Sequence, residues 1–344
     1  MNTMRLGRTD FFVSRLAFGA LPIQRAPWEE AVPILRRAAE GGITFFDTAR
    51  LYSDSEAKIG AAFEGIRENL FLASKTMGGT PEAIRADLAV TLDNLRTDYL
   101  DVYQFHNPST VPLPGDGSGR YELFAELKRA GVIRAIGLTS HSLERARQAV
   151  DSGLYDTLQY PFSLLATGEE EDLVASCRAA DVGFICMKAL AGGLVRDIPA
   201  AFAFMGRFDN VLPIWGIQRM SELEEFLALE AAPPLWNEPM AEIARDYREA
   251  LGKSFCRGCG YCQPCPQEIA VHTVARLFLT LRRSPWKPFA EPSWQKEMAR
   301  VENCTQCGTC ASRCPYHLDP PALIRRSLDD YVAFMRERGV DLTF

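Results

Sequence analysis

The sequence predicts an α/β fold, a (β/α)8 TIM barrel, followed by a small, mainly helical, cysteine-rich domain. Strand-like and helix-like segments alternate eight times over roughly the first 230 of the 344 residues. The strand-like segments are continuous apolar runs, as parallel strands buried on both faces require. Eight of the ten cysteines stand in two runs near the C-terminus. Eight units match a closed barrel. A doubly wound sheet would usually have fewer strands, and no Gly-x-Gly-x-x-Gly follows the first strand.

Each unit of the barrel is expected from an apolar run and a helix with recognisable ends. Strands are expected at 16–21, 43–48, 69–75, 99–106, 134–139, 157–160, 183–189 and 211–217. Helices are expected at 29–40, 56–65, 81–94, 121–130, 143–152, 170–180, 199–205 and 221–229. Gly41-Gly42, Gly131 and Gly153 are typical helix stops, and Thr80 and Ser221 are expected N-caps.

The chain is expected to divide into four parts. Residues 1–230 form the barrel, 231–255 a Pro-rich joint and a helix, 256–320 a two-cluster domain, and 321–344 a C-terminal helix. Within the tail, helices are expected at 238–251, 269–283 and 321–338, with a Pro/Trp-rich turn at 284–294.

Composition narrows the class of partner. The formal net charge of −6 argues against nucleic acid. The polar N-terminus lacks the apolar stretch of a signal peptide, and no apolar run is long enough to span a bilayer. We therefore expect a cytoplasmic protein with reduced thiols and no membrane partner.

The cysteine runs predict two [4Fe–4S] clusters. They are Cys256, Cys259, Cys262 and Cys265, followed by Pro266, and Cys304, Cys307, Cys310 and Cys314, followed by Pro315. In two-cluster ferredoxins the Cys-Pro cysteine of each run ligates the other cluster. One cluster then takes Cys256, Cys259, Cys262 and Cys314, and the other takes Cys304, Cys307, Cys310 and Cys265. Ligation of each cluster by a single run, and structural zinc, are the alternatives.

Polar residues end three adjacent apolar strands, where the chemistry of such barrels sits. Asp47 and then Tyr52 follow the second strand, Lys75 ends the third, and His106 ends the fourth. A lysine near a tyrosine is expected to lower the tyrosine pKa, and the aspartate keeps the lysine charged and in place. The tyrosine then gives a proton to a carbonyl oxygen, and the histidine hydrogen-bonds that oxygen. The structural alternative is a buried Asp47–Lys75 pair with a hydrogen-bonded rim histidine.

These residues carry a resemblance to the aldo-keto reductase family. Residues 42–56 (Gly-Ile-Thr-Phe-Phe-Asp-Thr-Ala-Arg-Leu-Tyr-Ser-Asp-Ser-Glu) closely resemble the family signature, and 5–19 and 100–106 resemble its first segment and fourth strand. The resemblance implies Asp47, Tyr52, Lys75 and His106 as a catalytic tetrad. Residues 261–267 and 314–318 resemble a subgroup fused to a dicluster ferredoxin-like domain.

The resemblance also implies a site for NADP(H) or NAD(H), with departures from the family pattern. Carboxamide contacts are implied for Thr139 and Ser140, with Gln159 on the sixth strand. Met187, followed by Lys188, replaces the aromatic residue that stacks on the nicotinamide. The phosphate loop becomes Gly216, Gln218 and Arg219, with Trp215 in place of proline. The helix from Ser221 is expected to offer free N–H groups to a phosphate.

The expected function is that of an iron–sulfur oxidoreductase acting on a small carbonyl or alcohol substrate. NAD(P)H supplies or receives hydride, and the clusters connect the site to a ferredoxin or another one-electron carrier. One alternative is a nicotinamide-independent radical reductase or dehydroxylase fed by the clusters. Another is a non-catalytic redox relay or sensor subunit.

Overall fold

The chain consists of two compact units, Met1–Ala244 and Arg245–Phe344. The computed structural model describes residues 1–344 except 167, 252–254, 259, 261, 283–285 and 315. Helix α9 (Glu238–Leu251) carries the boundary between the units.

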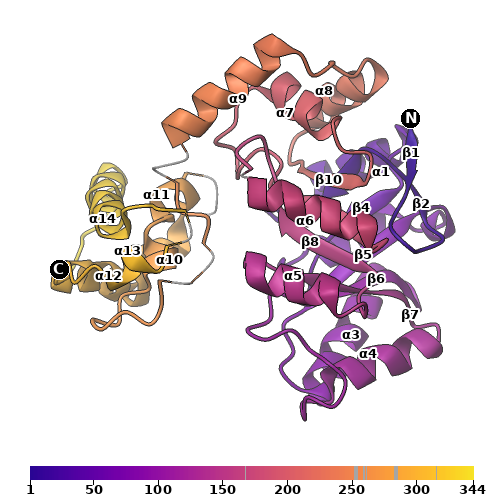
Figure 1. Cartoon of the computed structure of the whole chain (residues 1–344), viewed down its shortest axis with the longest axis horizontal. Helices are drawn as coiled ribbons and strands as arrows, with labels where there is room; N and C mark the ends of the chain where they lie inside the picture. Colours follow the sequence, from indigo (N-terminus) through magenta and orange to yellow (C-terminus); the bar gives the residue numbers. More distant parts are fainter. Residues whose placement is uncertain (167, 252–254, 259, 261, 283–285, 315) are drawn as a thin grey trace. The chain divides into compact units, whose positions relative to one another are not determined.

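The first unit is a closed barrel of eight parallel strands in the order β10-β3-β4-β5-β6-β7-β8-β9 (Figure 1). The strands are β3 (Ala17–Gly19), β4 (Phe45–Asp47), β5 (Phe71–Thr76), β6 (Leu100–His106), β7 (Ile133–Thr139), β8 (Thr157–Pro161), β9 (Gly183–Met187) and β10 (Val211–Gly216). The helices are α1 (Trp28–Glu40), α2 (Ser55–Ala62), α3 (Pro81–Leu95), α4 (Arg120–Arg129), α5 (Leu143–Asp151), α6 (Gly168–Ala179), α7 (Ile198–Met205) and α8 (Met220–Ala231). The eight expected β/α units are therefore confirmed.

A short antiparallel hairpin, which the sequence analysis did not predict, precedes the barrel. It pairs β1 (Thr3–Arg5) with β2 (Phe12–Ser14). Leu6, Phe11 and Val13 are buried in one apolar cluster with residues from the start of the barrel strands. Gly7 lies at φ +55°, and a Cβ there would come within 2.1 Å of the Gly183 amide nitrogen. Only glycine allows the hairpin to pack so closely against β9.

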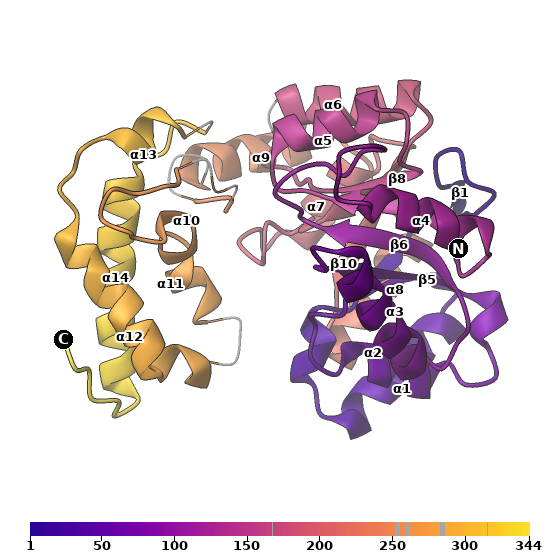
Figure 2. The ribbon, with the colours of Figure 1, turned by 90° about the horizontal axis from the view of Figure 1, so that it is seen from below.

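The second unit is helical and has its own core (Figure 2). Its helices are α10 (Val271–Val274), α11 (Leu277–Thr280), α12 (Pro292–Ala299), α13 (Thr309–Ser312) and α14 (Pro320–Glu337). The amphipathic α14 buries Ile324, Tyr331 and Met335, and the Tyr331 hydroxyl donates to the Phe289 carbonyl oxygen at 2.7 Å. The expected C-terminal helix is confirmed.

Two expectations for the tail are wrong. The single helix expected at 269–283 is divided into α10 and α11, because the chain turns at Ala275 and Arg276. This turn lets Val274 and Leu277 both enter the core beside α14. The stretch expected as a turn at 284–294 contains a 3-10 helix, Lys287–Ala290, and the start of α12. None of the helices in the described part of the chain is long and apolar enough to cross a membrane.

Candidate active site and cluster sites

A buried ion pair lies at the carboxyl ends of β4 and β5. The Lys75 ammonium donates to both carboxylate oxygens of Asp47, at 2.8 and 2.7 Å, and to the Thr48 carbonyl oxygen at 2.6 Å. Asp47 is 2% exposed and Lys75 is 1% exposed. Burial raises the pKa of Asp47 and lowers the pKa of Lys75, while the charge of each partner opposes the shift of the other. All three ammonium hydrogens therefore have acceptors, which fixes the cation in position.

Two buried glutamines extend this pair across the barrel. The Gln104 amide donates to Asp47 Oδ1 at 3.3 Å and to Gln159 Oε1 at 2.9 Å, and the Gln159 amide donates to Asp47 Oδ2 at 3.4 Å. Gln104 faces Lys75 and Gly137 in the sheet register. A Cβ at Gly137 would lie 2.6 Å from Gln104 Cγ, so this glycine makes room for the amide. The sequence analysis did not single out Gln104, although a glutamine inside an apolar strand was a usable signal.

Tyr52 and His106 stand together beside the ion pair. Their ring centroids are 5.9 Å apart with the rings nearly perpendicular, and Lys75 Nζ lies 5.2 Å from the Tyr52 ring centroid. Burial and the charge of Lys75 lower the pKa of His106 to about 3. His106 Nδ1 is buried and has no hydrogen-bond partner among the described residues. The structure thus brings all four residues of the expected tetrad into one place.

The expected lowering of the Tyr52 pKa is wrong. Burial, and then the negative charge of Asp47, raise this pKa well above its ordinary value. The reason is that Asp47 compensates the charge of Lys75, so the ammonium does not stabilise a phenolate as an isolated cation would. Tyr52 is a protonated phenol in this arrangement, and neutral His106 lies at its side.

The residues expected to hold the nicotinamide lie on or just after β7, β8 and β9. Thr139 and Met187 end β7 and β9, Gln159 lies inside β8, and Ser140 and Lys188 follow β7 and β9. Thr139 Oγ1 accepts from the backbone N–H of Asn107 at 2.8 Å. The Ser140 hydroxyl donates to the Ser142 carbonyl oxygen at 3.1 Å and accepts from the Ser142 amide at 3.0 Å. The rim groups that the sequence predicts here are Thr139, Ser140, Gln159, Met187 and Lys188. Ser140 is wholly buried, and its side-chain hydrogen bonds to Ser142 hold the turn into α5.

The expected phosphate loop joins β10 to α8. Gly216 is exposed and lies beside Pro22, and Gln218 and Arg219 follow it. The expected N-cap at Ser221 is wrong, because Arg219 holds that position and Ser221 lies in the first helical turn. The Glu222 carboxylate accepts from the backbone N–H of Gln218 at 2.8 Å and from the backbone N–H of Arg219 at 3.0 Å. Glu222 therefore takes the role in capping that was expected of the serine.

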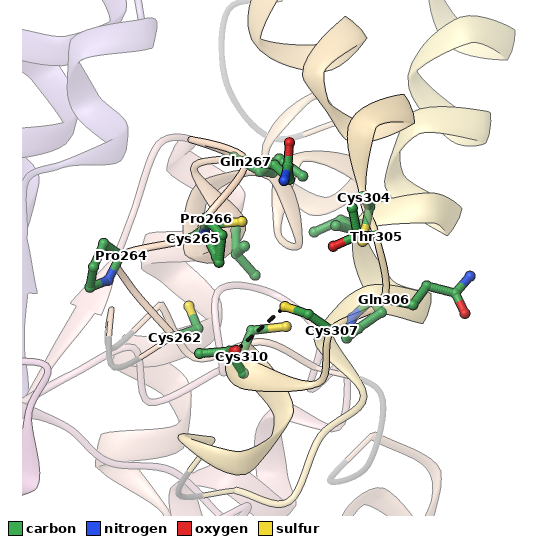
Figure 3. Close-up of a pocket in the computed structure, with 15 residues that line it drawn as sticks. Cys262, Pro264, Cys265, Pro266, Gln267, Cys304, Thr305, Gln306, Cys307 and Cys310 are labelled. Carbon is green, nitrogen blue, oxygen red and sulfur yellow. Dashed lines mark hydrogen bonds between the residues drawn. The ribbon is translucent and has the colours of Figure 1, made fainter.

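The described cysteines of the second unit line two hollows. One hollow, of about 380 Å³, is lined by cysteines of both runs (Figure 3): Cys262, Cys265, Cys304, Cys307 and Cys310. Its other lining is apolar or uncharged, including Ile269, Val271 and Pro266. The exposed Cys307 thiol donates to Thr309 Oγ1 at 3.4 Å, and hydrogen bonding to Thr309 lowers the pKa of Cys307, which favours the thiolate that iron binds.

The second hollow, of about 360 Å³, is lined by Cys256, Cys262 and Cys314. Cys259 lies outside the described residues. His272 and Arg257 also line this hollow, so it carries charge that the first hollow lacks. No three cysteine, histidine or carboxylate side chains within the described ranges converge closely enough to hold a single metal ion. Thiols spread around a hollow suit a cube of iron and sulfide better than one zinc ion, which needs four ligands about 2 Å away.

The fold and these sites define a (β/α)8-barrel protein with an ionisable rim and a cysteine-rich helical unit. Residues 15–206, more than half of the chain, match the aldo/keto reductase family, and the chain belongs to that family. Residues 255–319 match the 4Fe–4S dicluster domain. The expected fold class and the expected resemblances to the aldo-keto reductase family and to a dicluster 4Fe–4S domain are confirmed.

Several reductases are similar to this chain. The NADH-specific methylglyoxal reductase of Escherichia coli is 28% identical over 208 residues, which cover 52% of this chain and 64% of the relative. The aldo-keto reductase YhdN of Bacillus subtilis is 29% identical, with 57% and 66% covered. The chain thus spans somewhat less than two thirds of these relatives. An aldo-keto reductase from Klebsiella pneumoniae, solved with NADPH, is 25% identical with a TM-score of 0.61, covering 72% of this chain and 95% of that one.

Proposed function

We propose that this protein is an iron–sulfur oxidoreductase that interconverts a small carbonyl compound and its alcohol. Asp47, Tyr52, Lys75 and His106 are its catalytic groups, NAD(P)H is its hydride carrier, and two [4Fe–4S] clusters link it to a one-electron carrier of the ferredoxin class. The observation that carries the proposal is the buried Lys75–Asp47 pair, with the ammonium 5.2 Å from the Tyr52 ring centroid.

The four rim groups divide the work of carbonyl reduction. Tyr52, protonated because of its raised pKa, gives its proton to the oxygen of the carbonyl. Lys75 is the cation nearest to the negative charge that develops there, and Asp47 keeps it in place. The lowered pKa keeps His106 neutral, so it does not compete with Tyr52 as an acid. A neutral imidazole can still donate a hydrogen bond to the same oxygen. The nicotinamide, when bound, supplies hydride to the carbonyl carbon.

The nicotinamide end of the cofactor is assigned to residues on or just after β7, β8 and β9. The residues proposed are Thr139, Ser140, Gln159, Met187 and Lys188. Their common position on one rim with the tetrad supports this assignment. The adenosine ribose of the cofactor, which carries the 2′-phosphate in NADP(H), is assigned to Gly216, Gln218 and Arg219, at the loop between β10 and α8.

The two clusters are proposed to be ligated across the runs. Cys265 shares a hollow with the second run, and Cys314 shares the other hollow with Cys256 and Cys262, which supports this exchange of Cys-Pro ligands. Cys259 completes the second set in the proposal. The parts 1–230, 231–255, 256–320 and 321–344 are retained as proposed domain limits.

A nicotinamide-independent enzyme is the second candidate, favoured by one observation. The backbone donors expected to hold a phosphate already bind the Glu222 carboxylate. In this candidate, electrons from a one-electron donor pass singly through the clusters to the substrate, giving radical reduction or dehydroxylation. Reduction of the clusters by a low-potential ferredoxin, with no binding of either nicotinamide, would favour it.

The test of the leading proposal is Tyr52→Phe in anaerobically purified protein. Turnover of a panel of aldehydes and ketones should fall by about 10²–10⁴-fold, because the proton donor is lost. The cluster absorbance should be unchanged. Tyr121→Phe is the control, since it also removes one hydroxyl, which there donates to the Leu154 carbonyl oxygen. Full carbonyl turnover by Tyr52→Phe would overturn the assignment of the tetrad.

A further inference from the structure

The carboxylate of Glu222 occupies the anion-binding position at the start of α8. Its Oε2 accepts from the backbone N–H groups of Gln218 and Arg219, at 2.8 and 3.0 Å. Its Oε1 accepts from the Arg219 guanidinium at 2.6 Å. The side chain is 28% exposed, so the carboxylate stands at the surface of this loop. One acidic side chain thus takes up two backbone donors and one cation.

A second arginine belongs to the same surface. Arg25 ends the 3-10 helix Pro22–Arg25, and Pro22 lies against Gly216 at the end of β10. Burial lowers the pKa of Arg25, and the charge of Glu222 opposes that shift. The buried Arg25 Nε has no hydrogen-bond partner among the described residues. The loop is therefore an anion cradle of two backbone N–H groups and the Arg219 guanidinium, already filled by Glu222, and Arg25 lies near enough for the charge of Glu222 to act on it.

The Glu222 carboxylate in this loop should affect the binding of NADP(H) and NAD(H) differently. They differ at the adenosine ribose, which carries a 2′-phosphate in NADP(H) and a 2′-hydroxyl in NAD(H). A phosphate monoester carries about −1.5 to −2 charges at neutral pH. In this cradle it would meet the Glu222 carboxylate and compete with it for the same donors. A hydroxyl instead donates to a carboxylate, as the acidic residue of dinucleotide-binding folds accepts from the ribose.

We infer that Glu222 determines the cofactor, so that this site takes NAD(H) and rejects NADP(H). The inference rests on the proposed function, because it requires that a nicotinamide cofactor binds. With Glu222 in place, the cradle does not fit a 2′-phosphate. Arg219 supplies positive charge that the phosphate would need, and Glu222 already pairs with it.

The test measures binding, independently of turnover. Anaerobic protein with its clusters loaded is titrated with NADH and NADPH, and each Kd is read from nicotinamide fluorescence and calorimetry. The wild type should bind NADH at least tenfold more tightly, a difference of about 1.4 kcal/mol. Glu222→Ser frees the backbone donors and the arginines, so it should tighten NADPH binding at least tenfold and reverse the preference. Glu222→Gln keeps a capping acceptor, and should improve NADPH binding even if the serine variant folds poorly.

Glu126→Gln is the matched control. It removes the same charge from a surface glutamate paired with an arginine, Arg85, at 2.9 Å, and it should leave the NADH/NADPH ratio unchanged. Equal or tighter binding of NADPH by the wild type would overturn the inference. So would an unchanged ratio in a folded Glu222 variant, and in both cases the proposed function survives. Binding of neither nucleotide by the wild type or either variant would overturn the inference together with the nicotinamide part of the proposed function.

Discussion

Removal of the charge of Asp47 should strongly destabilise the barrel. Asp47→Asn leaves Lys75 as a buried cation without a counter-ion, in a place where the ammonium is 1% exposed. Two unit charges 2.7 Å apart attract by about 6 kcal/mol at an effective dielectric constant of about 20. Desolvation offsets part of this attraction. Breaking one side of a buried pair typically costs about 3–5 kcal/mol, and we expect that range here.

Chemical and thermal unfolding of the anaerobic protein, followed by far-ultraviolet circular dichroism, measures this loss. The melting temperature of the barrel should fall by roughly 6–20 °C, at 2–4 °C per kcal/mol. Asp10→Asn is the control, because Asp10 is paired with Arg134 at 3.5 Å in an exposed position and should show no measurable shift. Adding Lys75→Met to Asp47→Asn should recover stability, since no unpaired charge then remains. A single variant as stable as the control would refute the reasoning.

Acidification should weaken the fold through His106, whose folded-state pKa burial lowers to about 3. The unfolded chain then binds the proton first, so stability present above about pH 6.5 is lost progressively between about pH 6.5 and 3. Between pH 6.5 and 5, the wild-type free energy of unfolding should fall about 2 kcal/mol more than that of His106→Gln; parallel curves would contradict this. Gly137→Ala should destabilise the barrel by about 1–3 kcal/mol, because the new Cβ would lie 2.5 and 2.6 Å from side chains of neighbouring strands. Gly79→Ala is the control and should not destabilise the barrel, because a Cβ there meets open space. Equal denaturation midpoints for the two variants would count against the expected clash at Gly137. Cys256→Ser and Cys314→Ser should each lower the iron content from about eight to about four atoms per chain, with the double variant no lower. Loss of all iron only in the double variant would instead indicate ligation within each run.

The barrel could be predicted because its elements carry strong local signals. The fourth expected strand, 99–106, agrees with β6 (Leu100–His106) to within one residue. The agreement is close because the segment is apolar and is followed by a loop rich in proline and glycine. The N-terminal hairpin could not be predicted in the same way. Its strands are three residues long, too short for an alternating pattern, and they form because the apolar side chains between and within them close the barrel.

The grouping of the proposed tetrad residues could be predicted because strand ends converge in a parallel barrel, so Asp47, Lys75 and His106 had to lie close together. The hydrogen-bond partners were harder to find. Gln104 lies two residues before a strand end, and its role depends on the space that Gly137 leaves on the next strand. Trp215 replaces a family proline, but its side chain packs between Phe202 and Phe226, with ring centroids 5.1 and 4.8 Å away. Only the register and packing of the folded chain decide such positions.

The four polar groups of the rim balance one another in charge, which the sequence did not reveal. Tyr52 and His106 are neutral, and Asp47 compensates Lys75, so these four groups together carry no net charge before substrate binds. In the proposed reaction, a carbonyl oxygen enters uncharged and becomes negative only as hydride arrives at its carbon. Lys75 and the Tyr52 proton then interact more strongly with the reacting state than with the bound substrate, which is the condition for accelerating the reaction. A phenolate would repel the developing charge, so the protonated form of Tyr52 that burial favours is the form that the proposed carbonyl reduction requires.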